Sequence, residues 1–314
     1  MTTSDTSYLS SFLSWMLFGS KILGTVVLGV TLLLYFNQDK ILYIPNPPGI
    51  PRTPDENPRG YKSPNDWTMK GRVRREGEVG IPFEDHMIRT KDSVSIHAWL
   101  LLHPQPENTT PYPTLIYFHG NAANMGFRLP NAALMYSECK INILMVDYRG
   151  YGKSTGSPTE TGLQLDAEAA LEFVRTHPKL QGSPVIVFGR SLGGAVSLYL
   201  ARRYPASVAG IVIENTFLSV SAMTDILLPL LKPIKPYLLR MHWDSGEAIV
   251  GADQPVLFIS GGRDVLVPPA HMKALYNLAT ASKHREWFFV EDGSHNDTWE
   301  KAGIEYYKVI PLFT

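Results

Sequence analysis

Three residue types that together perform acyl transfer occur in this sequence in the order serine, aspartate, histidine. Ser191 lies in a Gly-Arg-Ser-Leu-Gly segment, Asp264 follows Gly-Gly-Arg, and His295 follows Asp-Gly-Ser. A serine hydroxyl is a weak nucleophile until a base removes its proton. Histidine can be that base near neutral pH, and a carboxylate can fix its tautomer and stabilise its cation. The order therefore predicts nucleophilic attack on an acyl carbon.

The segment around the serine has the pattern of a strand, a tight turn and a helix. An apolar run over 185–188 precedes Gly189, and a helix-forming run over 195–201 follows Gly194. In this setting Gly-x-Ser-x-Gly predicts a nucleophile elbow, in which the serine occupies a strained turn. Glycine is expected at Gly189 and Gly193 because side chains there would collide with the turn. The five-residue pattern alone also fits a turn without chemistry, so the acid and the histidine decide its meaning.

Two carboxylates compete as the partner of the histidine. Asp264 and Glu214 both follow predicted strands. We favour Asp264 because its position in the loop after a strand matches the usual geometry for this order, although some relatives place the acid at the position of Glu214. Asp292 and Asp297 are too near His295 in the sequence to face its far nitrogen easily.

An oxyanion hole is expected from two backbone N–H groups. One is that of Leu192, directly after the serine, and the other that of Asn121, in the loop 119–124 after a predicted strand. Gly120 allows this loop to turn. His119 is expected to shape the loop through a structural hydrogen bond rather than to act as a base.

A long apolar segment near the N-terminus predicts a transmembrane helix. Residues 17–36 contain one charged residue, Lys21, and reach the roughly 20 residues that span a bilayer. A cleaved signal peptide fits less well because no basic residue precedes Lys21 and the run ends in aromatic and amide residues. We expect residues 1–16 to be a tail and 17–36 a single-pass, uncleaved anchor. Basic residues on its two sides show no asymmetry, so the side of the catalytic domain stays open. The anchor favours an endomembrane location, the endoplasmic reticulum first.

The rest of the chain predicts a linker and one α/β domain. Residues 37–80 are rich in proline and predict an extended linker, and 81–314 the domain. The expected strands are 86–90, 94–100, 114–118, 142–146, 185–188, 208–213, 256–259 and 287–290, and the expected helices 128–139, 160–177, 194–204, 269–281 and 298–309. This alternation predicts a mostly parallel central sheet with helices on both faces and a ligand site at the carboxyl ends of the strands. Residues 217–250 interrupt it and are a candidate helical lid, with ordinary packing helices as the alternative.

Composition excludes several other classes of protein. Lys plus Arg and Asp plus Glu number 29 each, which argues against nucleic acid as a partner. The single cysteine, Cys139, cannot form an intramolecular disulfide and is expected to be a packed small residue. The sequence contains no Cys/His cluster with metal-ligand spacing, so neither a metal nor another cofactor is expected.

Six motifs together resemble the serine α/β-hydrolase superfamily. They are Phe-Gly-Arg-Ser191-Leu-Gly-Gly, His119-Gly-Asn-Ala, Asp147-Tyr-Arg-Gly-Tyr-Gly-Lys-Ser, Glu214-Asn-Thr-Phe, Gly-Arg-Asp264 and Gly-Ser-His295-Asn. The chain is most similar to the membrane-anchored branch that includes α/β-hydrolase domain-containing protein 13 and the fungal bud emergence protein 46. Relatives often carry glycine at the position of Ala123 and another residue at that of Val265.

The resemblance implies hydrolysis of an ester, thioester or amide through an acyl-enzyme. The expected partners are a hydrophobic acyl ester or thioester and, through the N-terminal helix, a membrane; protein partners are not indicated. Two alternatives stay open: a membrane-tethered polarity or scaffolding protein with little turnover, and a serine peptidase of the same fold.

Overall fold

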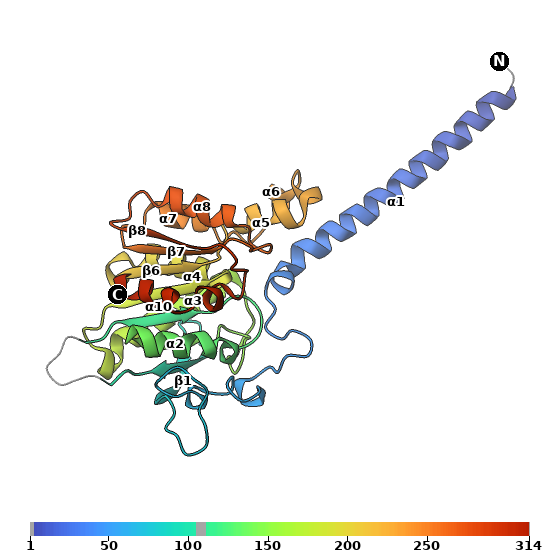
Figure 1. The fold of residues 1–314 in the computed structure, drawn as a ribbon. Helices are drawn as coiled ribbons and strands as arrows, with labels where there is room; N and C mark the ends of the chain where they lie inside the picture. The colour runs from blue at the N-terminus through green and yellow to red at the C-terminus, as the bar shows by residue number, and fades with distance from the viewer. Residues whose placement is uncertain (1–2, 105–110, 314) are drawn as a thin grey trace.

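An eight-stranded sheet forms the centre of the protein, whose computed structural model describes residues 3–104 and 111–313 (Figure 1). Its strands are β1 (Phe83–Arg89), β2 (Ser95–Leu101), β3 (Thr114–Phe118), β4 (Asn142–Val146), β5 (Val185–Arg190), β6 (Gly210–Glu214), β7 (Val256–Gly261) and β8 (Arg285–Val290). In space they lie in the order β1-β2-β4-β3-β5-β6-β7-β8. β2 is antiparallel to both of its neighbours, and the strands from β4 to β8 run parallel. The predicted α/β fold with a mostly parallel sheet is confirmed.

Helices cover both faces of this sheet. The α-helices of the described residues are α1 (Thr3–Leu42), α2 (Leu129–Cys139), α3 (Glu160–Thr176), α4 (Leu192–Arg203), α5 (Val220–Leu227), α6 (Lys235–Leu238), α7 (Ser245–Val250), α8 (Pro269–Leu278), α9 (Thr298–Ala302) and α10 (Ile304–Val309). Their 3₁₀ helices are η1 (Pro54–Glu56), η2 (Pro64–Asp66), η3 (Met125–Arg128), η4 (Pro178–Leu180), η5 (Pro205–Ser207), η6 (Pro229–Leu231) and η7 (Ile310–Phe313). Side chains of α3, α4, α7 and α8 form one hydrophobic core cluster with the sheet, and those of α2 and α10 form the other.

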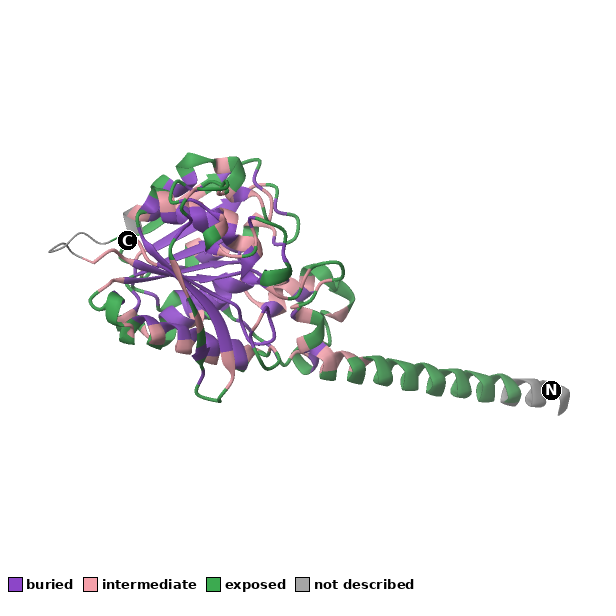
Figure 2. Ribbon diagram, turned by 90° about the horizontal axis from the view of Figure 1, so that it is seen from below, coloured by how far each residue is buried: buried purple, intermediate pink, exposed green. Residues whose placement is uncertain are grey.

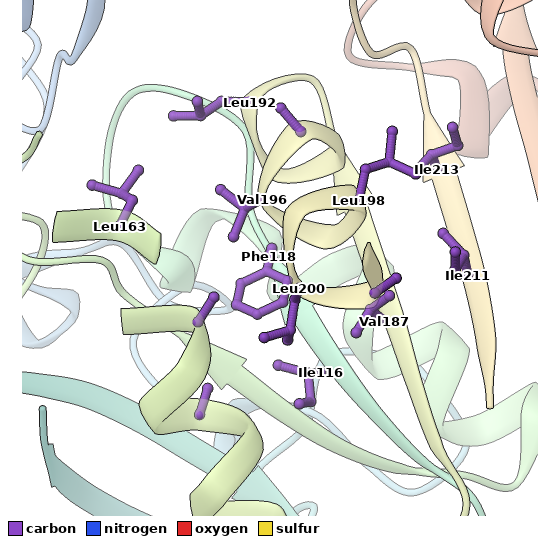
Figure 3. Close-up of a cluster of buried hydrophobic side chains, with 14 of the residues drawn as sticks. Ile116, Phe118, Leu163, Val187, Leu192, Val196, Leu198, Leu200, Ile211 and Ile213 are labelled. Atoms are coloured by element: carbon purple, nitrogen blue, oxygen red, sulfur yellow. The ribbon is translucent and has the colours of Figure 1, made fainter. Parts of the chain in front are cut away.

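The two cores arise from the alternation of side chains along each strand. In β3, Ile116 and Phe118 belong to the cluster under α4, whereas Leu115 and Tyr117 belong to the opposite one. A strand buried on both faces must be apolar throughout, which is why β3 could be predicted from sequence. Figure 3 shows Val196 of α4 lying over Phe118. Figure 2 shows the sheet buried between helices whose outer faces are exposed.

The element boundaries differ in places from the sequence prediction. β6 starts at Gly210, two residues later than expected, and α4 begins directly after Ser191. The helix expected over 298–309 is divided at Gly303, which has a φ of 56°. A left-handed residue cannot continue an α-helix, so the chain turns there.

The N-terminal helix α1 extends away from the sheet (Figure 1). Its segment Ser11–Leu42 has a mean hydropathy of 2.0 in an 18-residue window of which 0% is buried, so it is long and apolar enough to cross a membrane. The helix exceeds the expected anchor at both ends, because it includes residues of the tail from Thr3 and the first residues of the linker. Asn37, just after the apolar run, has non-helical angles (φ −111°, ψ 15°).

The proline-rich segment after α1 packs on the domain. Trp67 is buried, and its Nε1 donates to the carbonyl of Gly60 at 2.7 Å. Asn57 is also buried and donates to Asn124 Oδ1 at 2.8 Å. These contacts make the segment part of the domain surface.

The candidate lid divides into two parts. α5, η6 and α6 expose most of their apolar side chains, whereas α7 packs against α4 and α8 and buries Ile249. Residues 245–250 therefore form an ordinary packing helix of the core, which is the alternative that the sequence also allowed.

Candidate active site

Ser191 lies on a strained turn between β5 and α4. Its φ of 55° and ψ of −120° lie outside the regions that residues with a side chain normally occupy. Its backbone N–H donates to the carbonyl of Glu214 at 2.9 Å, and its carbonyl accepts from Thr216 Oγ1 at 2.6 Å. These bonds hold the serine in the strained conformation, and the side chain remains partly exposed at the strand ends.

The glycines beside the serine are required by close backbone contacts. A Cβ at Gly189 would lie 2.0 Å from the carbonyl oxygen of Gly193, and a Cβ at Gly193 would lie 2.0 Å from that of Phe118. Both distances are far below van der Waals contact, so no side chain fits. The chain thus passes from strand to helix through a tight turn at Ser191, the arrangement in which a nucleophile elbow is built.

His295 and Asp264 form a direct hydrogen bond. Nδ1 of His295 lies 2.7 Å from Asp264 Oδ2, and the two side chains are 12% and 1% exposed. The other carboxylate oxygen of Asp264 accepts from the backbone N–H groups of Leu266 (2.9 Å) and Val267 (2.8 Å). An ionised carboxylate only accepts hydrogen bonds, so this contact suits the imidazole tautomer with its proton on Nδ1, in which Nε2 carries the lone pair.

Glu214, the other candidate acid, is hydrogen-bonded to residues other than His295. It is fully buried, and its Oε2 accepts from Arg190 Nη2 at 3.1 Å and from the hydroxyl of Tyr306 at 2.7 Å. Burial alone would lower the pKa of the Arg190 guanidinium, but the charge of Glu214 raises it above its ordinary value. Glu214 therefore neutralises a buried cation inside the elbow motif, and Asp264 is the acid that contacts the histidine.

Asn215 links the ends of three strands. Its Nδ2 donates to the carbonyls of Ser294 (3.1 Å) and His295 (3.3 Å), and its Oδ1 accepts from the N–H of Gly261 at 2.8 Å. Asn215 has a φ of 47°, which asparagine tolerates better than most residues. This role of Asn215 was not predicted from the sequence, although the residue lies in the Glu-Asn-Thr-Phe motif.

Asp297 supports the histidine loop from within. Its Oδ1 accepts from the backbone N–H of Ser294 at 2.6 Å and from the Ser294 hydroxyl at 2.7 Å. It is thus a local turn residue, in agreement with its exclusion as the catalytic acid. Asp292, the other excluded acid, is exposed.

The loop expected to form the oxyanion hole lies beside the serine. A Cβ at Gly120 would lie 3.5 Å from Ser191 Cβ. His119 is buried, and its Nδ1 bonds the carbonyl of Gly120 at 2.7 Å, the structural hydrogen bond expected of it. Ala122 and Ala123 have φ values of 77° and 61°. These positive angles favour glycine, which is consistent with glycine at the position of Ala123 in relatives.

Different contacts fix the backbones of the two expected oxyanion donors. Leu192 is buried in the cluster of Figure 3, which fixes the backbone at the start of α4. Asn121 is fixed by its side chain, whose Oδ1 accepts from the N–H groups of Ile44 (3.0 Å) and Ala122 (2.9 Å) and from the hydroxyl of Tyr151 (2.7 Å). Sequence spacing gives no sign of this second role, because Ile44 and Tyr151 are distant from Asn121 along the chain.

One contact of the expected constellation is not formed. Both residues are described, and Ser191 Oγ and His295 Nε2 do not share a hydrogen bond within 3.5 Å. Contacts between a nucleophile and its base are often long without a substrate and tighten when one binds.

Tertiary structure also assembles a cluster that sequence spacing did not reveal. The ligand atoms of Glu84, His86 and His177 lie within 4.8 Å of one another, which could hold a metal ion. Glu84 accepts from both histidines, at 2.9 and 3.0 Å, and from Lys179 at 2.7 Å. Burial alone would raise the pKa of Glu84, but these donors outweigh it and lower the pKa to about 2. The charge of the Glu84 carboxylate is thus already balanced by these donors. The cluster lies at β1, which is remote in the sheet order from β5, the strand that leads to Ser191.

The mostly parallel sheet, the serine elbow and the acid–histidine pair at the strand ends define the class of α/β hydrolases. A family model described as the alpha/beta hydrolase fold matches residues 113–242. The chain is also 36% identical, over 299 residues, to the alpha/beta hydrolase domain-containing protein WAV2 of Arabidopsis thaliana, which covers 91% of this chain and 89% of the relative. This chain belongs to the α/β-hydrolase family.

Other similar proteins include Protein bem46 of Schizosaccharomyces pombe, 36% identical with 93% of this chain and 92% of the relative covered. The uncharacterized membrane protein YNL320W of Saccharomyces cerevisiae is 36% identical, with 74% of this chain and 80% of the relative covered. Among solved structures, the Pyrococcus furiosus esterase Pf2001 superposes with a TM-score of 0.58 at 20% identity, over 74% of this chain and 91% of that one. This last likeness shows the fold.

Proposed function

We propose that this protein is a membrane-anchored serine hydrolase that cleaves an acyl ester or thioester through an acyl-enzyme intermediate. The observation that carries the proposal is the 2.7 Å bond between Asp264 and His295 at the strand ends that also carry the Ser191 elbow. Ser191 is the nucleophile, His295 the base and Asp264 the residue that orients the base. Asn121 and Leu192 supply backbone N–H groups to the oxyanion, and Gly189 and Gly193 allow the elbow.

In the first half-reaction, Ser191 Oγ attacks the carbonyl carbon while His295 Nε2 accepts the hydroxyl proton. The carbonyl oxygen becomes an oxyanion that accepts hydrogen bonds from the N–H groups of Asn121 and Leu192, each of which contributes roughly 10²–10³-fold to the rate. The bond to the leaving oxygen or sulfur then breaks, and His295 gives it the proton.

In the second half-reaction, water attacks the acyl-Ser191 ester. His295 accepts a proton from the water, and a second tetrahedral intermediate uses the same N–H groups. Its collapse releases the carboxylic acid, and Ser191 Oγ regains its proton from His295.

The membrane setting supports a hydrophobic acyl substrate. We infer that α1 crosses the bilayer once. Its length and exposed apolar surface support this, and so does the similarity to YNL320W of Saccharomyces cerevisiae, which is named a membrane protein. An uncleaved N-terminal anchor favours the endomembrane system, with the endoplasmic reticulum the first compartment to test. Fluorescence microscopy of a C-terminal fusion tests the compartment, and protease protection of sealed vesicles tests the side.

A fluorophosphonate probe tests the nucleophile directly. The full chain should be labelled, and Ser191→Ala should abolish labelling. Ser197→Ala is the matched control, because this buried serine lies in α4 and its Oγ has no hydrogen-bond partner among the described residues. Labelling that persists in Ser191→Ala would refute the proposed nucleophile. Absence of labelling in the folded parent would favour the scaffolding alternative.

A further inference from the structure

The insertion after β6 ends in an apolar tip, residues 226–237, that is exposed. Leu230 is 90% exposed and Tyr237 88%, and four further apolar side chains there are at least 40% exposed: Ile226, Leu227, Leu228 and Ile234. The charged residues within the tip are Lys232 and Lys235. Contiguous apolar surface of this kind marks a binding surface for protein or lipid.

This tip is tied to the end of the membrane helix. The buried side chain of Gln38 donates to the carbonyl of Leu238 at 2.8 Å and accepts from the N–H of Arg240 at 2.9 Å. Arg240 also pairs with Asp39 at 3.4 Å and lies 5.3 Å from the ring centre of Tyr35. Figures 1 and 2 show α5 and α6 beside the end of α1 where it meets the domain.

These contacts place the tip at the level where the apolar run of α1 ends. Gln38 and Asp39 follow Asn37, the residue with non-helical angles after that run. Polar residues at this point mark the bilayer surface, and a segment held against them lies at the same depth. Lys232 is exposed, so its stem can extend along the apolar surface towards the headgroups, whereas the Lys235 ammonium is held by Asp225 at 2.5 Å.

We propose that residues 226–237 are a second membrane-contact site, which inserts its apolar side chains into the lipid leaflet beside α1. The occupant is the lipid surface of the membrane that holds α1, and the proposal rests on the proposed insertion of that helix. An apolar face with flanking lysines is the composition of segments that lie in the membrane interface. The tip therefore contacts lipid instead of closing over Ser191 as a water-exposed lid.

The insertion that carries the contact site begins beside Ser191 in space. Thr216, at the start of the insertion, donates to the carbonyl of Ser191 at 2.6 Å. With the tip in the lipid, the carboxyl ends of the strands face the bilayer. If the proposed hydrolase activity holds, its substrate is an acyl ester or thioester carried by the membrane.

Lipid quenching of a fluorophore tests the contact on the full chain. Leu230→Cys is labelled with an environment-sensitive dye in a Cys139→Ala background and reconstituted in phosphatidylcholine vesicles that contain doxyl-labelled lipids. Leu28→Cys, in α1, reports whether the anchor is inserted. Lys283→Cys is the matched control. This exposed residue lies just before the N-terminal end of β8, opposite to the carboxyl ends of the strands.

We expect quenching at position 230 to be at least three-fold stronger than at position 283, with a blue-shifted emission. Quenching at 28 but not at 230 would overturn the proposal. Protection at 230 from aqueous iodide without quenching by the lipids would also overturn it, because another protein surface or a second copy would then cover the tip.

A second measurement separates this contact from catalysis. The double variant Leu230→Glu/Tyr237→Glu should hydrolyse a water-soluble ester at the parental rate and a vesicle-borne ester at least ten-fold more slowly. Equal rates on both substrates would contradict the role in substrate access. Failure of the parent to hydrolyse either ester would refute the hydrolase proposal and leave the quenching result to decide the membrane contact.

Discussion

The side chain of Asn121 holds the chain that leaves the membrane helix, because its Oδ1 accepts a hydrogen bond from the backbone N–H of Ile44 at 3.0 Å. Its Nδ2 donates to the carbonyl of Leu42, the last residue of α1. The backbone N–H of the same residue is the proposed oxyanion donor. The end of α1 and the loop proposed to form the oxyanion hole are thus joined through one side-chain amide.

Asn121→Ala should lower kcat about ten-fold, with a smaller effect on KM. The substitution keeps the backbone donor but removes three hydrogen bonds accepted by Oδ1 and one donated by Nδ2, which together stabilise the docked loop by roughly 2–6 kcal/mol. Steady-state kinetics with a water-soluble ester measures the change, and limited proteolysis over 42–50 reports the loosened chain. Asn46→Ala, at an exposed position, is the control. Parental kcat with faster proteolysis would show that the loop does not depend on this clamp.

Asp264→Asn should lower kcat by about 10⁴-fold without unfolding the protein, because an amide can leave the histidine in the wrong tautomer. Ester hydrolysis and the rate of fluorophosphonate labelling measure the loss. Far-ultraviolet circular dichroism checks that the fold is retained.

Glu214→Gln should lower the stability of the protein and largely keep its activity, in contrast to Asp264→Asn. It removes the charge that compensates the buried Arg190 guanidinium, and breaking such a pair costs about 3–5 kcal/mol. Thermal unfolding in detergent should show a lower Tm, whereas kcat of the folded fraction should stay within about ten-fold of the parent. A large loss of kcat at unchanged Tm would instead identify Glu214 as the catalytic acid.

Gly193→Ala should prevent the elbow from forming. Its Cβ would lie 2.0 Å from the carbonyl oxygen of Phe118, a backbone atom that cannot move aside without distorting β3. We expect poor expression or a strongly lowered Tm, together with loss of labelling at Ser191. Gly251→Ala has no atom within 4 Å of the added carbon and should behave as the parent. A stable, labelled Gly193→Ala protein would disprove the turn geometry.

Cys139 should resist alkylation at pH 8 in the folded protein. Burial raises the pKa of its thiol to about 12, and only the thiolate is nucleophilic. The neutral thiol persists up to that pH, so iodoacetamide should react slowly between pH 7 and 9 and rapidly after denaturation. Mass spectrometry of the tryptic peptide measures the extent. Fast alkylation of the native protein would show that this thiol is accessible.

The sequence alone was sufficient to predict features that depend on local chemistry. Alternation of fully apolar strands with helices predicted the sheet, since a strand covered on both faces has no polar positions. Glycines on either side of Ser191 predicted the elbow because the clashes they avoid lie within a few residues or on the neighbouring strand. The long apolar run predicted α1, although helix ends depend on contacts such as those of Gln38 that lie outside the run.

Tertiary structure decided which distant residues meet. Asp264 and Glu214 both follow strands, and only the path of the loops brings the first to His295 and the second to Arg190. The bonds from Asn121 to the end of α1 span more than 70 residues, and hydrogen bonds of that kind leave no periodic signal in a sequence. Hydropathy likewise marked residues 217–250 as one apolar insertion. Packing, which hydropathy does not report, divides them into a core helix and an exposed tip beside α1.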